Sequence, residues 1–105
     1  MNVYGAAHNL VDEIRKTDEY NKMIAIQNEL DKNSEVKKLL FEFSEEQMKL
    51  NSKHMTGQEI SETDIMSVQK KHDVLVQYKL ANDFLETQLK YTNMMTEISK
   101  IINGE

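Results

Sequence analysis

The chain has 105 residues, of which 39% are apolar and 30% charged, and it contains no proline, tryptophan or cysteine. This length suggests one domain over residues 1–105, and the composition is rich in good helix formers. The lack of cysteine excludes disulfides, thiolate zinc sites and cysteine-ligated iron–sulfur clusters, and the net charge of −5 argues against direct nucleic-acid binding.

The N-terminal part of the chain predicts two helices. Apolar residues recur at helical spacing over Val3–Lys16 and form one face. Thr17 is the expected N-cap of the second helix, because Asp18 and Glu19 would then stand in its first turn, where the helix dipole favours negative charge. The helical pattern of this second segment fades at residues 31–33.

A third helix is expected to begin near Ser34. Its apolar positions step by four and three residues, which is typical of the contact line of a coiled coil. This line, or seam, contains Val36, Leu40, Phe43, Gln47, Leu50 and His54. A polar residue such as Gln47 in a seam lowers stability but can fix register and partner number.

The stretch "SKHMTGQEISETDI", residues 52–65, is expected to turn the chain between two helices. Gly57 stands where a helix C-terminus needs a residue in the left-handed conformation. Ser61 and Asp64 are spaced like an N-terminal capping box, with Asp64 in place of the usual Glu or Gln. We expect a structural role for these residues and no chemistry.

The C-terminal part predicts a fourth helix from Glu62 and a long last helix that ends at Asn103-Gly104. A single helix reaching Ile102 would span about 60 Å, which is too long for one small domain. The apolar face also changes between Val76 and Ala81, so a break is expected near residues 77–79. The seam of the last helix contains Ala81, Phe84, Gln88, Tyr91, Met95, Ile98 and Ile102.

These elements predict an all-α fold of about five helices, with long antiparallel helical hairpins in a bundle. A last helix of about 24 residues would be roughly 36 Å long, which matches or exceeds the diameter of a compact domain of this size. Such helices project from the body or are covered by a second chain. We therefore expect a homodimer whose interface, also the candidate partner interface, uses the seams of the third and last helices.

Neither a membrane span nor a secretion signal is expected. The longest uninterrupted apolar run covers Met23–Ile26, whereas a span needs about 18 apolar residues. The first residues lack the basic start and apolar stretch of a signal peptide. These features predict a cytoplasmic protein without membrane insertion.

The residue inventory predicts no catalytic, cofactor or metal site. None of His8, His54 and His72 follows a glutamate by three residues, so the Glu-x-x-His motif of di-iron bundles is missing. Three kinds of function stay open. They are a non-enzymatic adaptor that binds proteins, a small holdase-type chaperone suggested by seven methionines, and a helical bundle that senses a ligand or metal through its histidines.

The ordered set of segments resembles the YlbF/YmcA/YheA-like family of small helical bacterial proteins. The resemblance covers nearly the whole chain and is carried by "NVYGAAHNLVDEIRKTDEY", "NSEVKKLLFEFSEEQMKL" with Phe43 and Gln47, "HMTGQEI" and "MMTEISKII". The Asn-Pro that often opens the family's last helix is Tyr78-Lys79 here.

The resemblance implies a dimeric all-α protein without enzymatic activity. Some members of the family regulate competence, sporulation and biofilm formation within a complex that adjusts the specificity of the membrane-anchored endoribonuclease RNase Y. Members of that complex can carry iron–sulfur clusters on cysteines, which this chain lacks, so no cluster is expected. In its missing cysteines and its "TGQEI" turn, the chain is more similar to the YheA-like members of the family.

Overall fold

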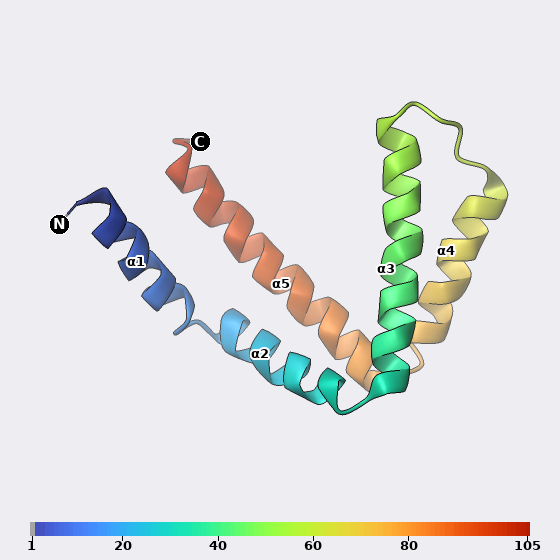
Figure 1. Cartoon of the computed structure of the whole chain (residues 1–105), viewed down its shortest axis with the longest axis horizontal. Coiled ribbons are helices and arrows are strands. Elements are labelled where there is room, and N and C mark those ends of the chain that lie inside the picture. Colours follow the sequence, from blue (N-terminus) through green and yellow to red (C-terminus); the bar gives the residue numbers. More distant parts are fainter. Residues whose placement is uncertain (1) are drawn as a thin grey trace. The chain divides into compact units, whose positions relative to one another are not determined.

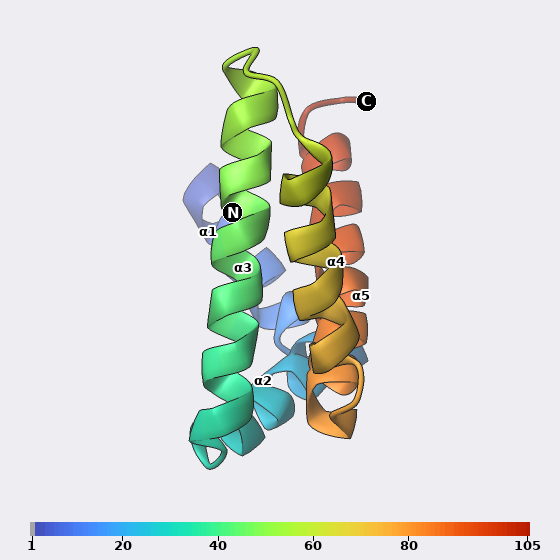
Figure 2. The same ribbon diagram turned by 90° about the vertical axis from the view of Figure 1, so that its right-hand side faces the viewer.

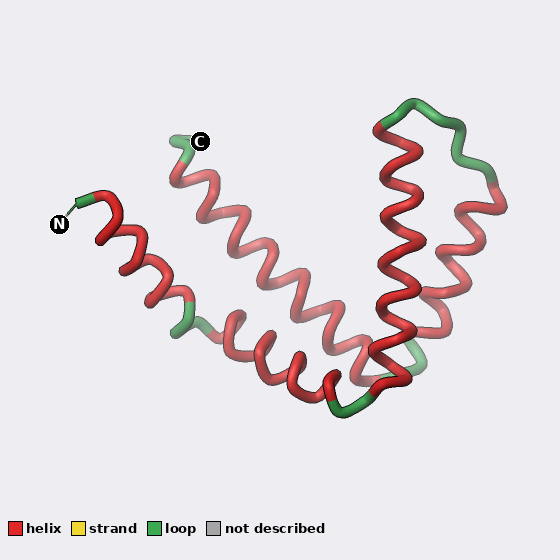
Figure 3. The backbone as a smooth tube through the Cα atoms, viewed as in Figure 1, coloured by secondary structure: helices red, strands yellow, loops and turns green. Residues whose placement is uncertain are grey.

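The computed structural model describes residues 2–105, and within this range the chain forms five α-helices and no strand. Figure 1 shows them in chain order as α1 (Val3–Ile14), α2 (Asp18–Asp31), α3 (Ser34–Met55), α4 (Glu62–Leu75) and α5 (Lys79–Ile102). Only short connections separate them (Figure 3). The all-α prediction is therefore confirmed.

The end of α1 and the break between α4 and α5 can be compared with their predicted positions. The first helix ends at Ile14, two residues before the predicted end at Lys16. The amides of Lys16 and Thr17 donate to carbonyls three residues back, and the Thr17 hydroxyl donates to the Ile14 carbonyl at 2.6 Å, so the chain tightens into a turn. The predicted break near residues 77–79 is present, because α4 ends at Leu75 and α5 begins at Lys79.

The chain divides into two compact units. Unit 1 comprises the residues up to Asn28 together with Asp83–Glu105, and unit 2 comprises Glu29–Asn82. Unit 1 therefore holds α1 and most of α2 and α5, whereas unit 2 holds the whole of α3 and α4. The single domain over residues 1–105 stays a prediction.

Unit 2 is built on the pairing of α3 with α4, which lie side by side in both views (Figures 1 and 2). Lys53 pairs with Asp64 next to the turn, and Glu46 pairs with Lys71 further along. At the far end, the Tyr78 hydroxyl donates to Glu35 at 3.1 Å. These contacts join residues progressively earlier in α3 to residues progressively later in the chain from α4 onward. The two helices therefore run antiparallel.

Buried apolar side chains hold this pair together. Val36, Leu40 and Phe43 of α3 and Leu75 of α4 are buried, with Val36 and Leu75 each only 1% exposed. The rings of Phe43 and His72 lie 5.8 Å apart at 49°, a tilted contact between the two helices. Burial of such side chains contributes about 1.5–3 kcal/mol each, which makes this line the main source of stability in unit 2.

In unit 1, α5 runs antiparallel to α1 and α2 (Figure 1). The rings of Tyr20 on α2 and Tyr91 on α5 lie 6.4 Å apart at 47°, which is within the range of favourable aromatic contacts. Thr17 caps α2, because its hydroxyl oxygen accepts the Tyr20 amide at 3.2 Å. Unit 1 buries far less than unit 2, and α1 contains no buried residue.

Candidate functional site: protein-binding surfaces

The first candidate surface is the apolar face of α1. The side chain of Asn2 caps this helix by accepting the Gly5 amide at 2.8 Å. Val3, Tyr4 and Val11 are nevertheless exposed, and Tyr4 keeps 75% of its surface accessible. A helix of 12 residues is marginal in water unless its apolar face packs against something. This face is therefore available to another chain.

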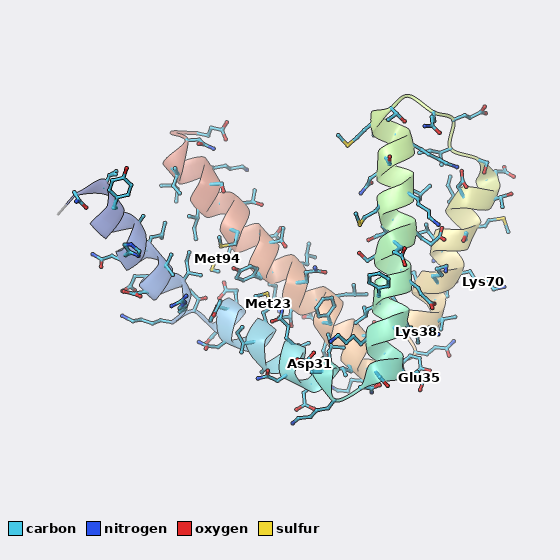
Figure 4. All side chains as sticks on the ribbon, in the orientation of Figure 1. Met23, Asp31, Glu35, Lys38, Lys70 and Met94 are labelled. Atoms are coloured by element: carbon cyan, nitrogen blue, oxygen red, sulfur yellow. The ribbon has the colours of Figure 1, made fainter. Side chains whose placement is uncertain are left out.

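The second candidate surface is a groove between α2 and α5, which we call the α2–α5 groove. It encloses about 890 Å³, and all of its lining residues belong to unit 1. Its apolar lining includes Ala25 and Ile26 from α2 and Met94 and Ile98 from α5. Figure 4 shows Met94 projecting from α5 into the space between these helices.

The charges around the α2–α5 groove are mainly negative. Five acidic side chains line it, against two lysines, Lys22 and Lys90. Lys90 is also paired with one of those acids, Glu86, at 3.1 Å. Acidic groups beside an apolar surface raise the local concentration of cationic partners and favour their binding.

The seam predicted on the third helix splits into residues with different surroundings. Val36, Leu40 and Phe43 are buried within the single chain, Leu50 is half-buried, and Gln47 is exposed. The first three were predicted to contact a second chain or a partner. Within the single chain their surface is covered, in the unit where α3 packs on α4, so their part in an interface stays a prediction.

The seam predicted on the last helix is more open. Phe84, Tyr91, Met95 and Ile98 are half-buried, whereas Gln88 and Ile102 are exposed. Part of the Tyr91 side chain contacts Tyr20 of the same chain, and Ile98 also lines the α2–α5 groove. The remaining surface of this seam is accessible to a second chain.

Two surfaces were missed in the sequence. On α3, Phe41, Met48 and Met55 are all exposed and recur every seven residues, so they form one stripe. That spacing was visible but was overlooked beside the stronger seam that includes Phe43. The α2–α5 groove combines residues 18–26 with residues 83–98, and no local pattern reveals which distant segments come together.

The turn between α3 and α4 has a defined hydrogen-bond structure. Gly57 has φ of +74°, in the left-handed region. The Ser61 hydroxyl accepts the Asp64 amide at 3.1 Å, and the Asp64 carboxylate accepts the Ser61 amide at 3.2 Å, which together form a capping box. The hydrogen bond from Lys53, followed by that from the Ser61 amide, lowers the pKa of Asp64.

Within residues 2–105, no group of three or more His, Asp or Glu side chains is placed to hold a metal ion. No helix in this range is both long and apolar enough to cross a membrane. The pKa of Tyr78 is also shifted, and its hydrogen bond to Glu35 raises it. That contact lies at the surface of unit 2 and joins α3 to the turn before α5.

The sequence of the chain matches one protein family along almost its whole length. Residues 3–105 match the family model Com_YlbF, described as "Control of competence regulator ComK, YlbF/YmcA". The chain belongs to the Com_YlbF family. The predicted resemblance to YlbF and YmcA is thereby confirmed, and the description of the Com_YlbF family supports a regulatory role.

Similar proteins in other bacteria extend the comparison. This chain is 30% identical to a UPF0342 protein of Staphylococcus epidermidis over 102 residues, covering 97% of this chain and 90% of the relative. It is 26% identical to a UPF0342 protein of Bacillus velezensis over 102 residues, with 97% and 88% covered. A UPF0342 protein of Caldicellulosiruptor saccharolyticus is 25% identical over 101 residues, with 96% and 84% covered.

Proposed function

We propose that this chain is a non-enzymatic regulatory protein that acts in the cytoplasm by binding other proteins, and that its working form is a homodimer. The observation that carries the proposal is the uncovered apolar surface of unit 1. The helix α1 has no buried residue, although Val3, Tyr4 and Val11 are apolar or amphipathic. Surfaces of this kind mark sites of protein–protein contact.

The homodimer is proposed to use the open part of the α5 seam. Phe84, Met95 and Ile98 are half-buried and Ile102 is exposed, so a second copy could cover apolar area that one chain leaves accessible. Sedimentation equilibrium at tens of micromolar should give the mass of a dimer for the wild type. The Ile102→Asp variant should shift toward monomer, because a charge would then be buried in the interface.

The regulatory effect is proposed to pass through a protein partner. The net charge of −5 disfavours direct contact with RNA phosphates. The resemblance to the YlbF/YmcA group implies that some members adjust RNA processing by RNase Y. We propose a comparable role for this chain, with its effect on RNA exerted through a bound protein.

A second candidate function is that of a holdase-type chaperone. The exposed methionines Met48, Met55 and Met66 favour it, because flexible thioether side chains adapt to unrelated apolar clients. A chaperone of this type would suppress the aggregation of several unfolded proteins with similar efficiency. A regulator would leave them unaffected.

Affinity purification from the native host, followed by mass spectrometry, tests the proposal. The experiment compares the wild type with Val11→Asp, which changes the apolar face of α1, and with Met66→Asp, a matched change on α4. We expect one or two defined proteins to be recovered saturably by the wild type and by Met66→Asp, and to be lost with Val11→Asp. Recovery of many unrelated unfolded proteins would support the chaperone, and equal recovery by all three forms would contradict a role for α1.

A further inference from the structure

We infer that the α2–α5 groove is a docking site for a basic amphipathic helix of a partner protein. The inference rests on the proposed function, since it names the chemistry of the partner that the regulator binds. It commits to one occupant, a helix of about four turns with apolar residues on one face and lysine or arginine along the edges of that face.

The length and lining of the groove suit a helix. Its residues on α5 run from Asp83 to Ile98, which corresponds to about 22 Å along a helix axis. The apolar lining from Ala25, Ile26 and Met94 offers a seat for side chains spaced three and four residues apart. Methionine at such a seat adapts to side chains of different shape.

Charge complementarity selects a basic occupant. Because α5 runs antiparallel to α2, Asp18 and Glu19 in the first turn of α2 lie toward the same end of the groove as Glu97, whereas Asp83 and Glu86 line its other end. Acidic side chains are therefore present at both ends of the apolar lining. Two of these acids are paired with lysines, Glu86 with Lys90 and Glu97 with Lys100. The five acids of the lining still outnumber its two lysines, an excess that a cationic helix would neutralise.

The chain itself offers no helix of this kind. The sequence of α1 contains no lysine or arginine and carries Asp12 and Glu13. The longest helices, α3 and α5, carry equal numbers of acidic residues and lysines, and α2 and α4 carry more acids than lysines. A second copy would bring no net positive charge to the groove, which favours a different protein as its occupant.

Fluorescence anisotropy with two labelled model peptides tests the inference on the full chain. One peptide is an 18-residue amphipathic helix of leucine and lysine, about five turns long so that four turns can fill the groove, and the other has glutamate in place of every lysine. The key variant is Met94→Glu, which adds negative charge to the groove while removing apolar lining. Leu89→Glu is the matched control, because Leu89 is on the same helix, 62% exposed and outside the groove.

We expect saturable one-to-one binding of the lysine peptide and none of the glutamate peptide. Met94→Glu should weaken binding by about tenfold, and Leu89→Glu should leave it within about twofold, because a seated apolar face contributes more than one additional charge. Circular dichroism of both variants confirms that they are folded. Equal binding of the two peptides, or unchanged or stronger binding by Met94→Glu, would overturn the inference.

Two further outcomes separate this inference from the proposed function. If Met94→Glu still recovers the same partners from the native host as the wild type, the partners bind elsewhere, so the docking site is wrong while the regulator remains. If Met94→Glu instead converts a dimer to monomer and the lysine peptide does not bind, the groove is an interface between copies, and the inference is overturned.

Discussion

The ammonium group of Lys53 lies 2.7 Å from the Oδ2 atom of Asp64, across the turn that joins α3 to α4. The same oxygen accepts the Ser61 amide at 3.2 Å, so one carboxylate both caps α4 and ties it to the last turn of α3. Both side chains are partly buried, with Lys53 at 35% and Asp64 at 28% exposed. This pair gives the turn a specific structure and predicts that its stability depends on pH.

The stability of the turn should decrease in acid. The pKa of Asp64 is lowered in the folded chain, so its contribution is complete above the ordinary value of 3.8 and is lost as pH falls through the lowered value. The Asp64→Asn variant lacks this pH-dependent contribution to stability. Its urea midpoint should therefore be lower than that of the wild type at neutral pH, and the difference should shrink in strong acid. A difference that is constant with pH would show that the carboxylate charge does not stabilise the turn.

Removing the Ser61 hydroxyl should destabilise α4. Ser61→Ala leaves the Asp64 amide without its acceptor and should cost about 1 kcal/mol in the free energy of unfolding. Ser99→Ala on α5 serves as the control, because alanine is a better helix former than serine within a helix. Urea unfolding measures both variants, and equal midpoints for Ser61→Ala and the wild type would contradict the capping role.

Gly57 should resist substitution because of its backbone conformation alone. Its φ is +74°, and a Cβ atom built there meets nothing within 4 Å, so a clash with neighbours plays no part. Gly57→Val should cost about 1–2 kcal/mol through the strain of a β-branched residue at positive φ. Gly104→Val, also at positive φ with φ of +73°, should cost less, because the chain end can change conformation freely. Urea unfolding distinguishes the two, and equal losses would argue against this account.

The line of buried residues between α3 and α4 should dominate the stability of unit 2. Leu75→Ala removes a side chain that is 1% exposed and should cost about 2–5 kcal/mol. Leu89→Ala truncates the same residue type where it is exposed and should change stability by less than about 0.5 kcal/mol. Thermal melting of the two variants is the measurement. Similar melting temperatures would mean that Leu75 is not in a packed core.

The order and bounds of the helices were predictable because their signals are local. The capping pattern at Ser61, the acidic start of α2 after Thr17 and the change of apolar face before Ala81 each act within a few residues. The partner of each apolar face was not predictable. A line such as Val36, Leu40 and Phe43 has the same four–three spacing whether it packs on a helix of its own chain or on a second chain.

The candidate binding surfaces show the same limit more strongly. The α2–α5 groove exists because two segments far apart in sequence run antiparallel in unit 1. Its acidic character could be predicted only by knowing which two segments lie together, because neither segment is unusual alone. The apolar spacing of the α5 seam, from Phe84 to Ile102, could be read from the sequence, because the spacing of apolar residues on one long helix is a local property. Its use as an interface stays a prediction.

We propose that the uncovered faces of unit 1 are contact surfaces for other proteins. Site-specific photo-crosslinking in the native host tests it most directly, with p-benzoylphenylalanine in place of Tyr4 on α1, Ile102 on α5 or, as the control, Met66 on α4. We expect discrete crosslinked species of defined mass from the Tyr4 and Ile102 positions and not from Met66, whether the neighbour is a second copy or another protein. No crosslink at Tyr4 and Ile102, or the same smear of products from all three positions, would contradict it.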